Sequence, residues 1–403
     1  MFNSADLLLP NLNEKDFSKW AVIACDQFTS QPEYWERVKN FVGDSPSAYN
    51  LILPEALLSE DDNEKISQIN ATMNEYLEKN IFNEYKNSYI YVERTLLDGS
   101  IRRGLVGVID LEEYDFKLGS ASKIRATEET VTERIPPRKK IRENAPIELS
   151  HVILLCDDER REIIESLTLK KDNLKKIYDF NLMLDSKNIK GWLVDGKEAE
   201  ALSKKIEDYE ARKSQELSVV YAIGDGNHSI AAAKVCYEAG FTSRYAMVEL
   251  ENIYDDALKF EPIHRLVKNI DVEKFLQEIQ DSICVKNPDD SNSWPINFYS
   301  RNKSGIINID KSLGASALIV LQKYLDEKIK FENFEIDYIH DTDALKNLSE
   351  AKNSLGFEMP PFDDSAKRDF FKIISKSGVM PRKTFSMGHA QEKRFYLEAR
   401  RIK

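Results

Sequence analysis

The sequence predicts an α+β fold with mixed sheets, hairpins and packed helices, and three observations lead to this prediction. Residues 89–97 and 101–111 are rich in strand-forming side chains and flank Asp98 and Gly99, the pair favoured in a type I′ turn, so they predict a β-hairpin. Residues 63–80 repeat apolar side chains at helical spacing, which predicts an amphipathic helix. Hairpins and helices follow one another without a regular βαβ alternation, which favours α+β over α/β.

The remaining elements follow from apolar runs, helical spacing and loop-forming residues. Short apolar runs predict buried strands at residues 20–25, 152–156, 219–223, 245–249, 296–299, 305–309 and 336–340. Helical patterns predict a helix opening near residues 33–35, helices over most of 157–217 (with 199–215 as a solvated helix), and helices at 272–283 and 316–328. The charged, proline-containing residues 121–146 predict a loop-rich segment.

Length and composition predict a globular protein of two domains. The chain has 403 residues, of which 42% are hydrophobic and 31% charged, a composition able to bury real cores. Because domains typically have about 150 residues, more than one is expected. We expect an α+β core that carries the strand-turn-helix site at residues 1–270, and a C-terminal α+β domain that packs on it at residues 271–403.

The net charge and the cysteine content limit which partners and which cellular compartment are expected. A formal net charge of −12 argues against nucleic acid as a partner, since nucleic-acid binding relies on basic surface. No apolar run approaches the roughly 20 residues that span a bilayer, and the first residues lack the layout of a secretory signal. The four cysteines lie far apart and predict neither a disulfide framework nor a CxxC zinc site. A cytoplasmic protein without membrane contact is therefore expected.

The most informative segment is a strand, turn and helix at residues 219–234. A β-branched apolar run stops at Gly224, Asp225 and Gly226, and an alanine-rich segment of high helix propensity follows. Backbone N–H groups and the positive end of a helix dipole would meet at this turn, which suits a phosphate or another anion. The alternative is a plain connection whose Asn or Asp caps the helix. Neither a dinucleotide fingerprint nor a Walker A loop fits, because Ser229 replaces the third glycine and no Gly-Lys-Ser/Thr follows.

Five segments, at residues 124–130, 225–233, 262–265, 339–341 and 379–384, together resemble the uncharacterised family called domain of unknown function 1015. The segment DGNHSIAAA resembles the family signature DGHHRYxxA, and IRATEET resembles its IRPHExT segment. The segments PIHR, IHD and VMPRKT resemble its PTHR segment, YVHD strand and VMPxKST tail. The matches occur in order over most of the chain.

The resemblance implies a ParB/sulfiredoxin-like nucleotide-binding core. The family's DGHHR element is similar to that of free-serine kinases in the ParB/sulfiredoxin-like superfamily. Those relatives hold nucleotide phosphates with the turn and the following helix, and use a carboxylate as general base toward a hydroxyl. What is implied here is binding of ATP or ADP with Mg²⁺ and phosphoryl transfer to a small molecule.

Three departures from the family pattern bear on ligand binding. Asn227 stands for the first histidine of the signature, and Thr127 stands for the histidine of the upstream segment. Ser229 stands for the arginine that would bind a phosphate bidentately, and a serine hydroxyl supplies no charge. Either the ligand differs or another basic residue supplies the cation, the candidates being Lys234, Arg125, Arg134 and Arg138.

Three residues are expected to carry the chemistry. Glu128, with Glu129 beside it, is the expected general base, because phosphoryl transfer needs a carboxylate to orient the attacking hydroxyl. Asp225 would bind Mg²⁺ or accept a substrate proton, unless it only bonds its own turn. His228 would bind phosphate or act as acid and base, unless it only caps and packs the helix.

The remaining expectations concern ligand binding around this centre. The expected phosphate ligands are Gly224, Gly226, Asn227, Ser229, Lys234 and Arg125. His264 and Arg265 would form an anion clamp at the same site, unless they are a structural pair bound to carbonyl groups. The polar cluster that follows the first buried strand predicts pocket lining, and its members are Asp26, Gln27, Thr29 and Ser30. Cys25, just before that cluster, is expected to be a buried small residue and not a nucleophile.

The sequence thus leads to two functional hypotheses of different classes. The first is a nucleotide-binding kinase that transfers a phosphoryl group to a small hydroxylated metabolite, in the manner of free-serine kinases. The second is a non-catalytic ParB-like module that senses a nucleotide, and the absence of the turn arginine favours it. An enzyme of unrelated chemistry that reuses the turn remains a third reading. The expected partners are a nucleotide and a small-molecule substrate, and formation of a homodimer is left open.

Overall fold

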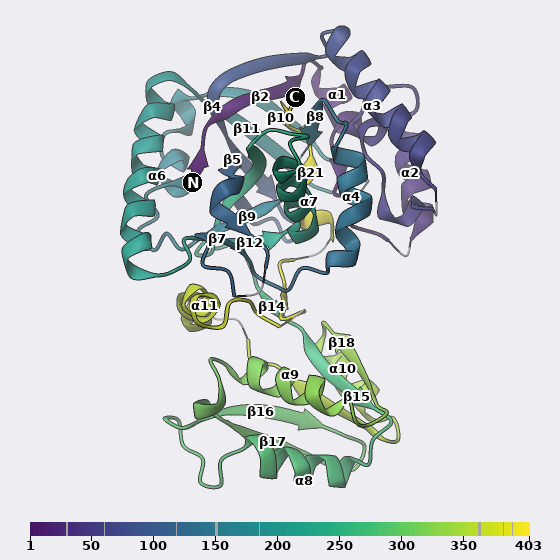
Figure 1. Ribbon diagram of the computed structural model, residues 1–403, viewed down its shortest axis with the longest axis vertical. Coiled ribbons are helices and arrows are strands. Elements are labelled where there is room, and N and C mark those ends of the chain that lie inside the picture. Colours follow the sequence, from purple (N-terminus) through teal and green to yellow (C-terminus); the bar gives the residue numbers. More distant parts are fainter. Residues whose placement is uncertain are drawn as a thin grey trace. The chain divides into compact units, whose positions relative to one another are not determined.

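The computed structural model describes the chain apart from residues 30, 60, 118, 150, 151, 185, 362, 363, 382 and 389. Its residues divide into two compact units, Met1–Leu258 with His389–Lys403, and Lys259–Gly388 (Figure 1). This division differs from the expected one after residue 270, because β15 (His264–Lys268) pairs within the sheet of the second unit and β22 (Ala399–Arg401) within that of the first. Both units mix helices with sheets, so the predicted α+β class is confirmed. Packing of one domain on the other stays a prediction.

The described part of the first unit contains one large mixed sheet. Its strands besides β22 are β1 (Phe2–Asn3), β2 (Ala5–Pro10), β4 (Phe82–Thr95), β5 (Ile101–Asp110), β6 (Tyr114–Asp115), β7 (Ile124–Ala126), β8 (Ile147–Leu149), β9 (Ile153–Cys156), β10 (Lys175–Asn181), β11 (Asn188–Val194), β12 (Tyr221–Asp225) and β13 (Tyr245–Asn252). They run in the order β6-β7-β12-β9-β13-β5-β4-β2-β22-β8, with β1 on β5 and the pair β10–β11 on β4. A separate short pair joins β3 (Val22–Ile23) to β21 (Phe395–Tyr396). The two ends of the chain therefore meet in this unit.

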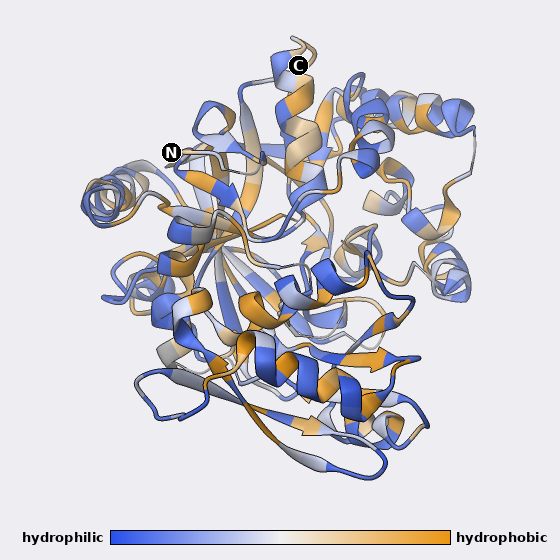
Figure 2. Ribbon diagram, turned by 60° about the horizontal axis from the view of Figure 1, so that its bottom comes forward, coloured by the Kyte–Doolittle hydropathy of each residue, from blue (hydrophilic) through white to orange (hydrophobic). Residues whose placement is uncertain are grey.

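The helices of the first unit contribute to two apolar cores on opposite faces of this sheet. They are α1 (Glu14–Trp20), α2 (Pro32–Val42), α3 (Asn63–Glu78), α4 (Ile135–Arg142), α5 (Ile164–Thr168), α6 (Gly196–Glu216) and α7 (Asn227–Glu238). Successive side chains of a strand point to opposite faces, and β4 shows this: Ile90 and Val92 belong to one core, Tyr89 and Tyr91 to the other. Hydrophobic and hydrophilic residues alternate around the helices, as their amphipathic patterns require (Figure 2).

The second unit is built on an antiparallel sheet. Its elements besides β15 are β14 (Glu261–Pro262), β16 (Ser293–Tyr299), β17 (Ser304–Asp310), β18 (Glu335–Ile339), β19 (Ser354–Glu358), β20 (Phe385–Ser386), α8 (Val272–Ile283), α9 (Ala317–Lys328), α10 (Thr342–Ser349) and α11 (Asp364–Ser377). Five strands form the sheet in the order β17-β16-β19-β15-β18 within the described residues. Side chains of α8 and α9, such as Phe275 and Leu321, share one core with the inward residues of this sheet.

Most predicted elements are confirmed, among them the strands at 152–156, 219–223 and 245–249, now β9, β12 and β13, and the helices at 63–80, 272–283 and 316–328, now α3, α8 and α9. The predicted hairpin is β4–β5, but its turn is not type I′. That type needs a positive φ at both central residues, and here Gly99 (φ 85°) has one while Asp98 does not. A bond from Leu96 N–H to the Ser100 carbonyl (2.8 Å) leaves a three-residue loop with glycine at its left-handed position.

One sequence prediction holds in part and another is wrong. Residues 121–146 are loop-rich as expected but also contain β7 and α4; Pro136 and Pro137 occupy the first turn of α4, where a missing N–H costs no helical hydrogen bond. Residues 157–217 are not mainly helical, because β10 and β11 form a second antiparallel pair on β4 before α6 begins. Among the helices that the structure describes, none combines the length and apolar character that a membrane crossing requires.

Candidate functional site

The turn between β12 and α7 depends on a glycine. Gly226 caps α7 with φ 84°, a left-handed conformation that other residues adopt only at a cost. A Cβ at this position would lie 3.0 Å from Cγ2 of Val152 and 3.1 Å from its Cα. The chain therefore turns sharply after Asp225, and α7 starts directly at the end of a buried strand.

The first turn of α7 presents polar groups at that strand end. The N–H groups of Ser229 and Ile230 bind the Gly226 carbonyl (3.0 and 3.1 Å), while the first N–H groups of a helix lack intrahelical acceptors and form its positive end. Oδ1 of Asn227 is buried and has no hydrogen-bond partner in the described part of the chain. A polar atom in that situation is a place where a ligand or a water would bind.

The segment that carries Glu128 lies against this turn. Strand β7 runs parallel to β12, so both strands end at the same edge of the sheet. Beyond β7, Thr127 donates to the Ile223 carbonyl through its N–H (3.3 Å) and its hydroxyl (2.8 Å). The N–H of Val131 then donates to Nε2 of His228 (3.2 Å). The loop from 127 to 131 is thereby fastened at both ends to the turn; within it Glu128 is half-buried and Glu129 exposed.

The same hydrogen bond assigns different roles to the two ring nitrogens of His228. A backbone N–H can only donate, so Nε2 accepts in this bond with its lone pair. Nδ1 is then the ring nitrogen that can donate to a ligand.

Asp225 is paired with a lysine from the far end of the chain. Nζ of Lys393 lies 3.4 Å from Oδ2 of Asp225, and the two side chains are 21% and 18% exposed. The Asp225 carboxylate raises the pKa of Lys393, burial opposes it, and Asp26 adds to the rise, so the ammonium is held near two carboxylates. Oδ1 of Asp225 also accepts the N–H of Gly226 (3.0 Å), the local turn bond considered above as an alternative role.

Lys393 is held in place by the buried residue that follows it. Arg394 is 2% exposed and its guanidinium binds Oε2 of Glu249 (2.6 Å) and Oε2 of Glu398 (2.9 Å). Arg94 shares Glu249 from the other side (2.9 Å). Such a buried network is costly to disturb, because each charge depends on its partners. It fixes the C-terminal segment across the sheet and presents Lys393 at Asp225.

Two expected phosphate ligands are not brought to the turn. Nε and Nη2 of Arg125 donate to the carbonyls of Ser122 (2.7 Å) and Ser218 (3.2 Å), which precede β7 and β12, so this guanidinium lies at the opposite end of the strands. Nζ of Lys234 donates to the Leu111 carbonyl (2.9 Å) and pairs with Glu238 (3.2 Å). At a rise of about 1.5 Å per residue, Lys234 lies about 10 Å along α7 from Asn227, its first residue.

The two other candidate cations differ in position. Arg138 pairs with Glu55, donates to the Arg134 carbonyl (2.8 Å) and lines a cavity beside Ser229, whereas Arg134 is exposed. The sequence did not identify Lys393. Lys393 is a basic residue near the C-terminus that lies outside every motif, and long-range pairing brings it to Asp225.

His264 and Arg265 belong to the second unit and have partners there. The N–H of Met359 donates to Nδ1 of His264 (3.1 Å), and Nε2 of the same ring lies 3.0 Å from the Thr342 hydroxyl. Burial lowers the pKa of His264, in keeping with a neutral ring. Arg265 is 1% exposed and donates to the Gln322 side chain (2.7 Å) and to the carbonyls of Ile263 (2.5 Å) and Lys383 (3.0 Å). These bonds are the carbonyl-binding alternative considered above, and the anion clamp stays a prediction.

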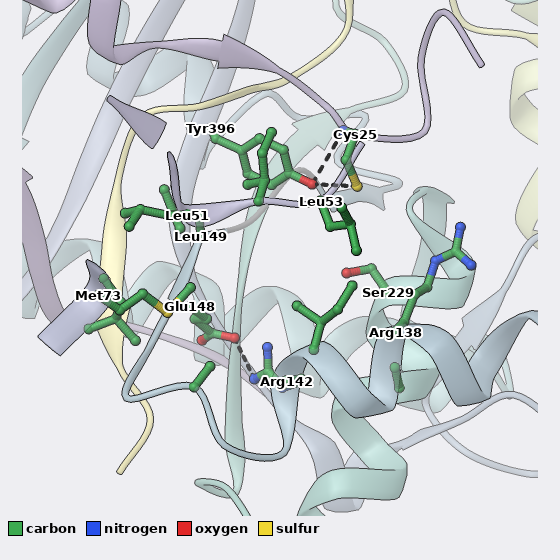
Figure 3. A pocket seen from close by; sticks show the side chains of 15 residues that line it. Cys25, Leu51, Leu53, Met73, Arg138, Arg142, Glu148, Leu149, Ser229 and Tyr396 are labelled. Carbon is green, nitrogen blue, oxygen red and sulfur yellow. Dashed lines mark hydrogen bonds and ion pairs between the residues drawn. The ribbon is translucent and has the colours of Figure 1, made fainter. Parts of the chain in front are cut away.

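A cavity of about 110 Å³ opens beside the first turn of α7. Ser229, Cys25 and Tyr396 are among its lining residues, and the hydroxyl of Ser229 faces the space (Figure 3). Tyr396 donates to Sγ of Cys25 (3.0 Å), and burial raises the pKa of Cys25 to about 11, so the thiol stays protonated and is no nucleophile. Within the polar cluster that follows, Gln27 donates to Oδ1 of Asp26 (3.0 Å), Thr29 is exposed, and Ser30 lies outside the described residues.

The described side chains do not form a preassembled metal site. Three or more His, Cys, Asp or Glu side chains placed to hold an ion are absent from the part of the chain that the structure describes. Asp225, the expected Mg²⁺ ligand, faces the Lys393 ammonium instead. The protein alone therefore does not fit a resident Mg²⁺ at Asp225.

With this geometry in view, comparisons with known proteins identify the family. The chain belongs to the family described as "Protein of unknown function (DUF1015)", which it matches over residues 10–333. Lys393 lies beyond that span. No match to a curated protein was found.

Several solved structures show a weak likeness to the chain. A conserved hypothetical protein from Pyrococcus furiosus has 13% identity and a TM-score of 0.35, with 72% of this chain and 92% of that chain covered. SbnI from Staphylococcus aureus, truncated at its C-terminus, has 11% identity and a TM-score of 0.37, with 68% and 82% covered. A free serine kinase in complex with AMP has 13% identity and a TM-score of 0.38, with 73% and 90% covered. These scores are too low to assign the activity of any of the three to this chain.

Proposed function

We propose that this protein binds the phosphates of a nucleotide at the β12–α7 turn and transfers a phosphoryl group to a small hydroxylated metabolite. The observation that carries the proposal is the hydrogen bond from Val131 N–H to His228 Nε2. It joins the loop of the expected base, Glu128, to the helix end that suits an anion. The proposal also includes a ParB/sulfiredoxin-like core for the fold and the formation of a homodimer.

The phosphates would bind at the start of α7. The N–H groups of Asn227 and His228 form the positive helix end, and Ser229 supplies a hydroxyl donor. Lys393 takes the place of the arginine that the turn lacks, because its ammonium is the cation found at Asp225. Arg125 and Lys234 have no part in this arrangement, since their charged groups are bound elsewhere.

The proposed reaction transfers the terminal phosphoryl group of ATP to the hydroxyl of the acceptor. The acceptor hydroxyl oxygen forms a bond to the terminal phosphorus of ATP, the bond from that phosphorus to the bridging oxygen breaks, and ADP leaves with the electron pair. The hydroxyl proton passes to the carboxylate of Glu128, and Lys393 offsets charge on the transferred group. Because the described residues hold no preassembled Mg²⁺ site, any Mg²⁺ would enter with the nucleotide, and no step is assigned to it.

Calorimetric titration with ADP and ATP in the presence of Mg²⁺ tests the proposal. We expect micromolar binding to the wild type and a weakening of about tenfold in His228→Ala, which removes one donor and unfastens the 127–131 loop. Glu128→Gln should keep the affinity and abolish turnover, whereas Glu129→Gln, the exposed neighbour, should keep both.

Three outcomes would contradict parts of this proposal. Absence of nucleotide binding to the wild type would remove the nucleotide site altogether. Turnover that survives in Glu128→Gln would remove Glu128 from the mechanism. Binding without turnover for a broad set of small alcohols would favour the non-catalytic nucleotide-sensing module.

A further inference from the structure

The cavity beside Ser229 has a mainly apolar wall. Its lining includes apolar side chains from well separated segments, of which Leu51, Leu53, Met73 and Leu149 are labelled in Figure 3. The cavity lies wholly within the first unit and opens next to the first turn of α7. Its polar groups are therefore few, and each can be examined for what it would bind.

The volume of the cavity limits the size of its occupant. It measures about 110 Å³. For comparison, an engineered apolar cavity of about 150 Å³ binds benzene, a molecule of six carbon atoms. A body of about four carbon atoms fits the space here by the same proportion. A nucleobase is larger than this, so the cavity is matched to a small acceptor and not to the nucleotide.

The charged groups of the wall carry a net positive charge. Glu148 pairs with Arg142, which lines the cavity (2.5 Å), and with Arg400, which lies outside its lining (2.9 Å). Burial acts to raise the pKa of Glu148, but the two arginines outweigh it and the pKa is lowered, which keeps the carboxylate ionised. Arg138 on the other side is neutralised by Glu55. Because Arg142 shares Glu148 with Arg400, its charge is not fully offset, so a carboxylate is favoured beside it and an ammonium is not.

The hydroxyl of Ser229 faces the cavity from the first turn of α7. We propose that the cavity binds a short hydroxycarboxylate, with its carboxylate toward Arg142, its apolar body among the leucines, and its hydroxyl toward Ser229. This inference rests on the proposed function, because it takes the bound molecule to be the phosphoryl acceptor. It departs from an amino acid as the acceptor, since an α-ammonium would lose its hydration against an apolar wall of net positive charge.

Three ligands with one carbon skeleton test this inference. 3-Hydroxybutyrate and L-threonine differ only in the ammonium group, and 1,3-butanediol replaces the carboxylate by an alcohol. Titrated into the wild-type protein with and without saturating ADP, 3-hydroxybutyrate should bind at least about tenfold more tightly than either of the other two. Equal or tighter binding of threonine, or no binding of any of the three, would overturn the inference.

A cavity-filling variant locates the binding. Ala232 lines the cavity and is buried, so Ala232→Val should weaken 3-hydroxybutyrate at least about tenfold by occupying its space. Ala199, equally buried on α6 and away from the cavity, gives the control Ala199→Val, which should leave the affinity unchanged. Melting temperatures of both variants separate lost binding from lost folding, and the ligand series on the wild type needs no variant.

The inference and the proposed function fail in different ways. If ADP binds and the three small ligands do not, the cavity proposal falls and the nucleotide site stands. If 3-hydroxybutyrate binds selectively and neither ADP nor ATP binds, the cavity stands as a binding site and the kinase proposal falls. If 3-hydroxybutyrate binds equally to Ala232→Val and to the wild type, it binds elsewhere and the cavity proposal falls.

Discussion

Replacing Lys393 by methionine removes the cation that pairs with Asp225 at the β12–α7 turn. Its ammonium lies 3.4 Å from Asp225 Oδ2, in a pair about four-fifths buried on both sides. Methionine keeps most of the length and apolar volume of the lysine stem, so the change is mainly one of charge. Lys234, on the same helix as the turn but bound to the Leu111 carbonyl and Glu238, provides the matched control Lys234→Met.

The structure sets different magnitudes for binding and for stability. A hydrogen bond between charged groups is worth about 1.5–3 kcal/mol, so loss of the Lys393 contact should raise the dissociation constant of ADP about tenfold to about a hundredfold. The free energy of unfolding should change less. Exposed ion pairs contribute about 0–1 kcal/mol and breaking a fully buried one costs about 3–5, so this partly exposed pair should contribute about 1–2 kcal/mol. That corresponds to a fall in melting temperature of roughly 2–8 °C for a unit of this size.

Calorimetry with ADP and Mg²⁺, together with thermal unfolding, measures both quantities on the full chain. We expect the ADP dissociation constant to rise in Lys393→Met and to stay within about twofold in Lys234→Met. If Lys393→Met binds ADP like the wild type, the lysine serves only to hold the C-terminal segment. If both variants lose affinity equally, the effect comes from the overall charge of the protein and not from contact at the turn.

Three further predictions concern the supports of the site and the second unit. Gly226→Ala should lower the free energy of unfolding by about 1–3 kcal/mol and abolish ADP binding, because Gly226 has a left-handed φ and a Cβ there would contact Val152. Gly240→Ala, where φ is 75° and the space is open, should cost about 1 kcal/mol and leave ADP binding intact. Urea unfolding and calorimetry compare the two variants. Arg394→Met should lower the free energy of unfolding by about 3–5 kcal/mol, since Glu249 and Glu398 lose a buried partner, and a loss below about 1 kcal/mol in urea unfolding would contradict the buried network. Burial lowers the pKa of His264 in the folded state, so the unfolded chain takes up a proton first as the pH falls below about 6.5. The free energy of unfolding should therefore decrease as the pH falls through that window. In His264→Gln the urea concentration at the unfolding midpoint should depend less on pH.

The sequence was a good guide wherever the signal is local. The strand, turn and helix around Gly226 were predicted because a β-branched run, a glycine and an alanine-rich segment each act through their own backbone preferences. The same holds for α3, whose apolar spacing alone specifies one buried face. The prediction failed at residues 175–194 because apolar residues such as Ile177 and Tyr178 fit either period over a short stretch, and pairing with β4 decides the outcome.

The sequence could not predict in which direction the charged side chains near the site point. Arg125 stands in the motif segment, but its guanidinium turns back to the carbonyls at the start of the strands. Lys234 follows the turn in sequence, yet the helical rise carries it away from the first turn. Lys393 is the opposite case, because it lies outside every motif and still reaches Asp225, held there by the buried ion pairs of Arg394. Distance along the chain was therefore a poor guide to which cation meets the turn.

The balance of charge at the turn explains why that cation matters. Asp225, at the end of β12, and Asp26, after β3, both act on Lys393, so two carboxylates lie near this ammonium. A helix N-terminus supplies the equivalent of about half a positive charge, which alone does not offset two carboxylates facing a phosphate. With Lys393 present most of this negative charge is offset, which lets an anion approach; without Lys393 the two carboxylates would attract a cation. Lys393→Met should therefore bind Mg²⁺ alone more tightly than the wild type does while binding ADP more weakly, because one ammonium decides the sign of the site. A parallel loss of both ligands would mean that the turn itself, and not its charge, depends on Lys393.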